Sequence, residues 1–569
     1  MSSLKDLVDE WLRLDQNQQT RQDIQTLWNA GNTEELERRM RVRIEFGTAG
    51  LRGKMEAGWA RMNDLIIIQA SQGLCAYALA HVDNAATRGV VIGHDHRHNS
   101  ERWAGLTAAA FIASGVKVYL LQGIVHTPMV PYSVKRLSAA CGVMITASHN
   151  PKQDNGYKVY WENAVQIIGP HDEGIADSIK ANLRPQSWDV NTATLSSLFT
   201  DVTAQMHEGY FKQLNQLNLS REANTKLNVK FVNTSMHGVS DRFVAEAFSS
   251  FGFAPYAPVK EQQQPDPEFP TVRFPNPEEK GASYVLAQDP DSDRFSAAER
   301  GANGEWTTFT GDQLGVIFGY RTFELYKATG KPIEKLAMVA STVSSKMLEA
   351  IARVEGFRFA ECLTGFKFIG NTALDLVKQG YEVPFGYEEA IGFMFGSEIR
   401  DKDGVAATVS FTELVTALHS EMKTVKSYLD DLYDRYFICT DPPTIDKIFA
   451  RVRSYDATAP SPSYPRSIGG LAVTSVIDLT TGYDSTNPPA YKPSLPLSSG
   501  HMIQFRAENK EDGTKIVLTT RTSGTEPKIK YYLEGSGKNA QSVHVLLPKV
   551  VAELGDVWLE AGKHGLGRA

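Results

Sequence analysis

The chain has 569 residues, a formal net charge of −7 and 42% hydrophobic residues, which together indicate a globular protein too long for a single core. This charge excludes a broad basic surface of the kind that binds nucleic acid or acidic membranes. The sequence has no apolar run of about 18 residues that could span a bilayer, and no apolar signal region at its start. The four cysteines lie far apart without a metal-binding spacing, so we expect reduced packing residues in a cytoplasmic protein.

The first part of the chain is predicted to alternate helices and strands. Apolar residues at helical spacing follow Ser3, a suitable N-cap, and predict an N-terminal helix. The next predicted elements are a strand at 90–92, a helix at 101–114 and strands at 116–121 and 143–145. This alternation is typical of an α/β domain, which we place at residues 1–200.

The same pattern returns twice. A second α/β domain is predicted at residues 201–312, with strands at 227–232 and 284–287 and a helix from about residue 239. A third is predicted at residues 313–440, with a helix from about residue 344 and strands at 336–341, 357–360 and 382–387. No identity-level repeat accompanies this order of elements.

The last part of the chain has a different composition. After a segment rich in proline and serine at 457–466, which indicates a hinge, four strand-like runs follow one another without long helices between them. They lie at 471–479, 502–505, 516–520 and 529–533, and a final helix is predicted from about residue 542. We therefore expect a C-terminal domain at 441–569 with a mainly antiparallel sheet.

The run Thr-Ala-Ser-His-Asn-Pro at 146–151 presents a serine directly after a predicted buried strand. The carboxyl ends of such strands are where α/β sheets place their chemistry. Ser148 is the candidate nucleophile, His149 is a neighbouring basic ring and Lys158 is a nearby cation. Taken alone, the run more often marks an ordinary turn, because Ser, Asn and Pro all favour turns.

Three carboxylates recur at every second residue in the run Asp289-Pro-Asp291-Ser-Asp293-Arg294. Alternate side chains of an extended segment point the same way, so the three can converge on one hard cation. The spacing does not fit an EF-hand, which needs a glycine and a glutamate at positions where this chain has arginines. With few protein ligands, the site favours Mg²⁺; the alternative is a solvated acidic turn.

A third run, Arg521-Thr-Ser523-Gly524-Thr525-Glu-Pro-Lys528, follows a predicted strand. Two cations, three hydroxyls and a glycine predict a cradle for phosphate. The alternative is a polar hairpin loop.

These runs resemble the motifs of the α-D-phosphohexomutase superfamily in their usual order. Two further runs complete the set, Phe-Gly-Thr-Ala-Gly-Leu-Arg-Gly at 46–53 and Gly-Tyr-Glu-Glu-Ala at 386–390. The resemblance extends from about residue 40 to the end of the chain. Within the superfamily, the sequence is most similar to the phosphoglucomutase-2 type, whose members act as phosphopentomutases with phosphoglucomutase activity.

The resemblance implies an α/β fold in which three similar mixed α/β domains and a C-terminal α+β domain surround one central cleft. It also implies that Ser148 carries the phosphate and that a Mg²⁺ ion is held by Ser148 and the three aspartates. Arg294 would neutralise charge, Lys158 would support the phosphoserine, and His149 or Lys402 would act as general base. Arg97 is either a phosphate-binding or a structural residue. The implied substrate-binding residues are Arg52, Thr364, Gly365, Glu388, Glu389, Arg521, Ser523, Gly524, Thr525 and Lys528.

The implied activity is a mutase that interconverts ribose or deoxyribose 1-phosphate with the 5-phosphate, and glucose 1-phosphate with the 6-phosphate. A sugar bisphosphate would be both intermediate and activator, and small sugar phosphates the partners; no oligomeric state is predicted. Ala390 stands where classical phosphoglucomutases carry serine, which favours pentose over glucose phosphate. The alternatives are a glucose 1,6-bisphosphate synthase, which shares these motifs, and a non-catalytic sugar-phosphate sensor.

Overall fold

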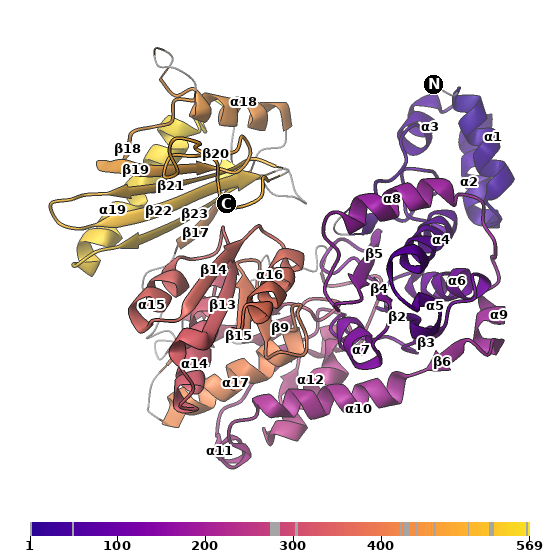
Figure 1. Cartoon of the computed structure of the whole chain (residues 1–569), viewed down its shortest axis with the longest axis horizontal. Helices are drawn as coiled ribbons and strands as arrows, with labels where there is room; N and C mark the ends of the chain where they lie inside the picture. The colour runs from indigo at the N-terminus through magenta and orange to yellow at the C-terminus, as the bar shows by residue number, and fades with distance from the viewer. Residues whose placement is uncertain are drawn as a thin grey trace.

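The computed structural model describes residues 3–47, 50–272, 285–301, 305–420, 424–425, 433–438, 442–456, 458, 462–498, 500–522, 528–564 and 567–568. Three α/β domains and a C-terminal domain with an antiparallel sheet follow one another along the chain (Figure 1), and we number them I to IV. This confirms the predicted fold class. No helix among these residues is both long and apolar enough to cross a membrane.

Domain I contains a six-stranded sheet in the order β1-β5-β4-β2-β3-β6. Its strands are β1 (Leu51–Lys54), β2 (Val90–His94), β3 (Val118–Leu120), β4 (Cys141–Ile145), β5 (Asp154–Trp161) and β6 (Phe199–Asp201). Its helices are α4 (Asp64–His81), α5 (Ala85–Arg88), α6 (Ser100–Ala113), α7 (Met129–Leu137), α8 (His171–Ala181), α9 (Val190–Leu195) and α10 (Thr203–Leu214). The central strands β2 and β4 are parallel neighbours, so the loops that follow them meet at one edge of the sheet.

Three helices precede this domain, α1 (Leu4–Leu14), α2 (Gln18–Asn29) and α3 (Thr33–Met40). Ser3 caps α1 through a capping box with Asp6, as the sequence predicted for its start. Trp11 is fully buried and packs edge-on against Trp59, with ring centroids 4.9 Å apart. The helices therefore share the core of domain I.

Domains II and III each contain a four-stranded sheet. The order in domain II is β10-β9-β7-β8, and in domain III it is β14-β13-β15-β16. The expected strand at 227–232 was wrong in its extent, because pairing in β7 begins only at Val232. The strands are β7 (Val232–Thr234), β8 (Ala257–Pro258), β9 (Val285–Gln288), β10 (Phe295–Ser296), the hairpin β11 (Ala298–Arg300) and β12 (Trp306–Thr308), β13 (Leu336–Ser341), β14 (Arg358–Cys362), β15 (Glu382–Glu388) and β16 (Gly392–Phe395).

One continuous apolar core joins domains I, II and III. It combines buried side chains from α7 and α10 with others from helices of domains II and III, including Phe243 of α12 and Phe411 of α17. The helices of the two domains are α11 (Arg221–Lys226), α12 (Ser240–Phe251), α13 (Lys260–Gln263), α14 (Gly311–Ala328), α15 (Met347–Glu355), α16 (Phe366–Lys378) and α17 (Gly404–Ser420). Shared burial of this extent holds the first three domains as one body.

Domain IV has its own core between a sheet and two helices, shown in orange and yellow in Figure 1. Its elements are β17 (Tyr433–Ile438), α18 (Pro442–Arg453), β18 (Ser467–Ile468), β19 (Leu471–Asp478), β20 (Tyr483–Asp484), β21 (Met502–Glu508), β22 (Lys515–Thr522), β23 (Lys528–Ser536), α19 (Ala540–Glu553) and β24 (Gly567–Arg568). Strand β17 pairs with β23, so domain IV begins before the boundary predicted at 440/441.

Candidate active site

Ser148 lies in the loop directly after β4. Its backbone has the left-handed conformation, with φ of 53°, and its backbone N–H donates to the hydroxyl of Thr146 at 2.9 Å. The side chain is buried, and its hydroxyl donates to the carboxylate of Asp289 at 2.8 Å. The loop thus presents one serine hydroxyl of domain I to the acidic loop of domain II.

Arg97 holds the serine loop in place from the neighbouring strand end. Its guanidinium donates to the carbonyl oxygens of Ser148 and Asn150, both at 2.6 Å, and to those of Pro151 and Asp154 at 2.9 and 3.2 Å. Its side chain is fully buried, and the carboxylate of Asp95 lies 3.4 Å away. Of the two roles left open by the sequence, these contacts support the structural one.

The three aspartates of the loop between β9 and β10 converge. Asp289, Asp291 and Asp293 are buried, and one ligand oxygen from each lies within 4.8 Å of the other two. One carboxylate oxygen of Asp291 and one of Asp293 are buried and have no hydrogen-bond partner in the part of the chain that the structure describes. Buried anionic oxygens need a compensating cation, and an all-oxygen set is what hard divalent ions prefer. The residues present therefore fit a metal ion.

Protein cations already balance part of this charge. Lys158 of β5 donates to Asp291 at 2.7 Å and to Asp293 at 2.9 Å. Burial alone would lower the pKa of Lys158, but the two aspartates raise it above its ordinary range. Burial would raise the pKa of Asp291, yet Lys158 and the Thr127 hydroxyl, 2.7 Å away, hold it below its ordinary range. For Asp289, burial and the two other aspartates raise the pKa well above its ordinary value.

Lys402 approaches the aspartates from domain III. Its ammonium lies 3.3 Å from Asp293 and 3.6 Å from Asp401. Burial opposes its charge, but these carboxylates raise its pKa. Lys402 is therefore a cation in this arrangement, although the sequence also suggested it as a base.

Arg294 connects the serine loop with domain III. Its guanidinium donates to the ring of His149 and lies 3.9 Å from Glu388, while its backbone N–H donates to Asp289 at 3.0 Å. Arg52, on β1, donates to the side chain of Asn150 at 3.3 Å. Both predicted arginines thus lie around the serine loop.

The predicted sugar-binding residues lie at two places in domain III. Glu388 ends β15 and is buried; burial raises its pKa, and Lys402 and Arg294 offset part of that shift. Thr364 and Gly365 precede α16, and the Thr364 hydroxyl is buried with no hydrogen-bond partner among the residues described. A buried hydroxyl of this kind is available to a ligand.

Glu389 faces domain IV. Its carboxylate accepts from the Arg521 guanidinium and from the Tyr532 hydroxyl, both at 2.8 Å, and from the Ser341 hydroxyl at 3.1 Å. The sequence paired Glu389 with Glu388 as a sugar ligand, but in this structure its acceptors are engaged by protein donors. Of the two glutamates, Glu388 is therefore the candidate ligand for a sugar hydroxyl.

The cradle of domain IV is described only in part. Arg521 lies near the end of β22, whereas Ser523, Gly524 and Thr525 lie outside the described residues. Lys528 begins β23, and its side chain lies outside them as well. Their predicted part in phosphate binding stays a prediction.

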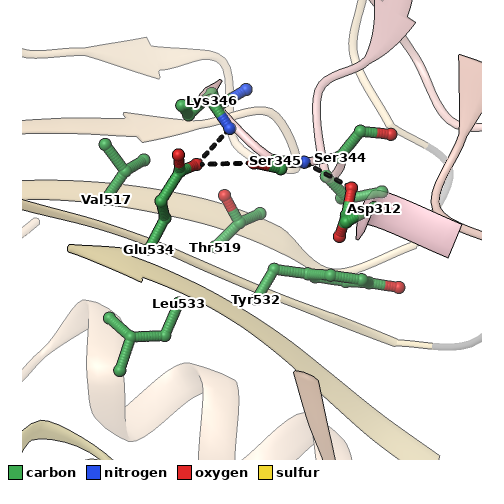
Figure 2. A pocket seen from close by; sticks show the side chains of 10 residues that line it. Asp312, Ser344, Ser345, Lys346, Val517, Thr519, Tyr532, Leu533 and Glu534 are labelled. Atoms are coloured by element: carbon green, nitrogen blue, oxygen red, sulfur yellow. Dashed lines mark hydrogen bonds between the residues drawn. The ribbon is translucent and has the colours of Figure 1, made fainter. Parts of the chain in front are cut away.

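A second contact between domains III and IV lies beside Glu389. The carboxylate of Glu534 on β23 accepts from the hydroxyl of Ser345 at 3.1 Å and from the backbone N–H of Lys346 (Figure 2). On the other side of the same turn, Asp312 accepts from the backbone N–H of Ser345 at 2.6 Å. Two carboxylates thus accept from the backbone N–H groups of the two residues that precede α15, and so lie at its N-terminus.

Contacts across the site connect all four domains. Ser148 bonds Asp289, Lys402 lies beside Asp293, and Glu389 bonds Arg521. Sequence reasoning missed Thr127 and Tyr532. No local pattern marks either residue, because each acquires its role through a partner more than 100 residues away in the chain.

Comparisons with known proteins agree with this geometry. Models of phosphoglucomutase/phosphomannomutase α/β/α domains I, II and III match residues 43–185, 208–303 and 310–436. The human phosphopentomutase is 44% identical, with 96% of this chain and 93% of that protein covered. The human glucose 1,6-bisphosphate synthase is 43% identical, with 98% and 95% covered. A probable phosphoribomutase of Schizosaccharomyces pombe is 43% identical, with 99% of both chains covered.

The fold also matches solved structures. An open form of the Paramecium phosphoglucomutase parafusin superposes with a TM-score of 0.64 at 17% identity, covering 91% of this chain and 95% of that one. A likeness at this identity supports the fold alone. Together with the domain matches and the close relatives, it shows that the chain belongs to the phosphoglucomutase/phosphomannomutase family of phosphosugar mutases, within the α-D-phosphohexomutase superfamily.

Proposed function

We propose that this protein moves a phosphate between the 1- and 5-hydroxyls of ribose and deoxyribose, with glucose 1- and 6-phosphates as secondary substrates. The observation that carries the proposal is the bond between the Ser148 hydroxyl and Asp289, inside a buried cluster of three aspartates and Lys158. A serine in this setting can carry a phosphoryl group between two positions of one sugar.

Phosphorylated Ser148 starts the cycle. The bond between its oxygen and phosphorus breaks as a free sugar hydroxyl bonds to phosphorus, and the proton of that hydroxyl passes to a base. A bound Mg²⁺, held by Ser148 and the three aspartates, would neutralise charge on the transferred group. The product of this step is a sugar bisphosphate beside an unphosphorylated Ser148.

His149 is the base that we favour. It lies next to Ser148 in the loop, but its ring accepts from the Arg294 guanidinium, so this bond has to break before the ring can take a proton; Lys402, the alternative, is held as a cation by Asp293 and Asp401. Lys158, Lys402 and Arg294 supply fixed positive charge around the transferred phosphate. Fixed charge of this kind lowers the barrier because it needs no reorganisation during the reaction.

The bisphosphate must then turn over, so that its other phosphate faces Ser148. Each end of the sugar therefore has to fit each subsite. Arg521 and the predicted cradle would hold the remote phosphate in both orientations, while Glu388 would accept hydrogen bonds from sugar hydroxyls. Return of the second phosphate to Ser148 regenerates the carrier and releases the isomer.

Turnover of ribose 1-phosphate and glucose 1-phosphate, measured with added bisphosphate, tests the proposal. We expect a higher kcat/KM for ribose 1-phosphate. Absence of turnover of both sugars by the phosphorylated protein would refute it. The second candidate is glucose 1,6-bisphosphate synthesis, because a relative with that name is as similar as the phosphopentomutase. A triose bisphosphate donor with glucose 1-phosphate, and no added bisphosphate, separates the two activities.

A further inference from the structure

The guanidinium of Arg521 is held by acceptors from two domains. It donates to Glu389 of domain III at 2.8 Å and to the hydroxyl of Tyr532 in its own domain at 3.2 Å. The Tyr532 hydroxyl donates in turn to the same oxygen of Glu389 at 2.8 Å. The three side chains therefore form a closed triangle of hydrogen bonds across the domain boundary, which leaves the guanidinium little rotational freedom.

Strand geometry places Tyr532 beside Arg521. On the paired strands β22 and β23, Arg521 lies opposite Lys530, and Thr519 lies opposite Tyr532. Tyr532 is thus the diagonal neighbour of Arg521, and the guanidinium lies 5.8 Å from the centre of its ring. Tyr532 and Glu534 alternate with Leu533, so both face domain III while Leu533 enters the core of domain IV.

The ring of Tyr532 is anchored in domain III as well. It belongs to an apolar cluster with Val343 and Leu363 of domain III and Leu479 and Met502 of domain IV. Leu363 immediately precedes Thr364, the start of the predicted sugar-orienting loop. A displacement of Tyr532 would therefore change the position of Arg521 and the packing of Leu363 next to that loop.

The negative charge of Glu389 and the positive charge of Arg521 offset each other within the triangle. Burial would raise the pKa of Glu389, but Arg521 and Lys530 lower it below its ordinary value, so the carboxylate is ionised at neutral pH. The Nε atom of Arg521 is buried and has no hydrogen-bond partner among the described residues, which do not include 523–527. The guanidinium thus retains a buried donor that a phosphate oxygen would satisfy.

We propose that Tyr532 and Glu389 are positioning residues for phosphate recognition. They fix the orientation in which Arg521 presents its Nε–H, and they connect this donor to the strand β15, which ends at Glu388, the proposed sugar ligand. The inference rests on the proposed function, because it assigns Arg521 to the phosphate remote from Ser148. In this arrangement, a substrate is held by one preorganised unit made of two domains.

The first test is Tyr532→Phe, which keeps the ring in its apolar cluster and removes both hydroxyl bonds. Tyr531→Phe is the matched control, because Tyr531 lies in the core of domain IV on the opposite face of the same strand. Arg521 holds the remote phosphate both before and during transfer. A misaligned guanidinium therefore weakens binding of the substrate and of the transition state equally, which raises KM and leaves kcat nearly unchanged. We expect KM for ribose 1-phosphate to rise 5- to 20-fold in Tyr532→Phe, with kcat changed less than 3-fold and KM of Tyr531→Phe unchanged.

A double-mutant cycle that combines Tyr532→Phe with Glu389→Gln tests whether both residues act on the Arg521 guanidinium. Both residues act on one guanidinium, so the KM of the double variant should be close to that of the worse single variant. Unchanged KM in Tyr532→Phe, an equal change in Tyr531→Phe, or fully additive effects would each overturn the inference. A structural role alone would lower Tm and the active fraction without raising KM.

The two proposals fail in different ways. If the wild type turns over neither sugar phosphate, the proposed function is wrong. The rise of Tm with added orthophosphate then tests the inference without turnover. We expect Tyr532→Phe to reduce this rise by at least half and Tyr531→Phe to retain it, whereas equal shifts in all three proteins would refute the positioning role.

Discussion

The hydroxyl of Ser148 and the carboxylate of Asp289 meet at 2.8 Å, although 141 residues separate them in the chain. The bond joins the loop after β4 in domain I to the loop after β9 in domain II. Both loops follow the carboxyl end of a parallel strand, which is where α/β folds place reactive groups. A phosphate on Ser148 would enter a site whose cations and acidic ligands are already in place.

Active protein should carry phosphate on Ser148. The proposed cycle can begin only from a charged donor, so a phosphopeptide map of the active protein should contain a modified peptide that spans this residue. Ser148→Ala should lose turnover of both sugars while retaining its Tm to within a few degrees. An unmodified peptide in fully active protein, or turnover by the alanine variant, would contradict the carrier role.

Asp291→Asn should lower kcat by a factor on the order of 10² or more, if the ion contributes at least about 3 kcal/mol to the transition state. The change removes an anionic ligand and also weakens the ion pair with Lys158 at 2.7 Å. Stabilisation of the protein by added Mg²⁺, followed as a rise in Tm, should decrease in parallel. Undiminished turnover in excess chelator would exclude a metal at this site.

Arg97→Lys should destabilise the serine loop. A lysine ammonium cannot bond four carbonyl oxygens in the planar arrangement that Arg97 uses. We expect a loss of about 3 kcal/mol, because buried carbonyls lose their donors around a buried charge. Both Tm and kcat should fall.

Arg88→Lys is the matched control, since Arg88 also donates to backbone carbonyls, those of Asp83, Ser138 and Ala139, but on a partly exposed surface. Its Tm should change little. Equal effects of the two substitutions would show that the buried position of Arg97 is not what matters.

Local sequence patterns predicted the reactive side chains of the site better than the residues that hold them in position. The spacing of Asp289, Asp291 and Asp293 is a property of one extended segment, so alternation alone predicts that they converge. Arg97, Thr127 and Tyr532 act through distant partners, and their position is set by how strands and domains pack. Such contacts depend on tertiary structure and leave no periodic signal in the sequence.

The same distinction applies to the fold. Eight of the sixteen strands that the structure describes in the three α/β domains were predicted, among them β2, β4 and β13, whose apolar runs are buried throughout. Several helices were missed, among them α2 and α3, although Asn17 and Asn32 cap these two through side-chain hydrogen bonds. Each helix is short and mostly polar, with one or two buried residues, so its apolar pattern is weak. The cap residues were the signal that could have located them.

Glu534 should make the contact between domains III and IV sensitive to pH. Burial raises its pKa from the ordinary 4.5 to about 7. The native state therefore binds a proton that the unfolded state releases between pH 4.5 and 7. The contribution of protonated Glu534 to the free energy of unfolding is fully present below pH 4.5 and is lost as pH rises through about 7.

This shift corresponds to about 3 kcal/mol of stability across that range. Differential scanning calorimetry of the wild type and Glu534→Gln at pH 5.5 and 7.5 checks the expectation. The wild type should lose more stability than the variant as pH rises, since glutamine does not titrate. Parallel changes in Tm of the two proteins would show that Glu534 does not titrate in this range.

Ala390→Ser should shift the substrate preference towards hexose. Ala390 lies in the turn after β15, two residues beyond Glu388, and is only partly buried. A hexose presents one more carbon and hydroxyl than a pentose, and a buried hydroxyl without a partner costs about 1 to 3 kcal/mol, or roughly 5- to 150-fold in kcat/KM. A serine hydroxyl at this turn would supply such a partner.

The ratio of kcat/KM for glucose 1-phosphate over ribose 1-phosphate should therefore rise, while the absolute rates are free to fall. Both substrates should be measured at one saturating bisphosphate concentration, so that phosphorylation of Ser148 does not limit either rate. A ratio that stays level or drops would move the origin of the preference to Tyr387 or to the loop from Thr364 to Lys367.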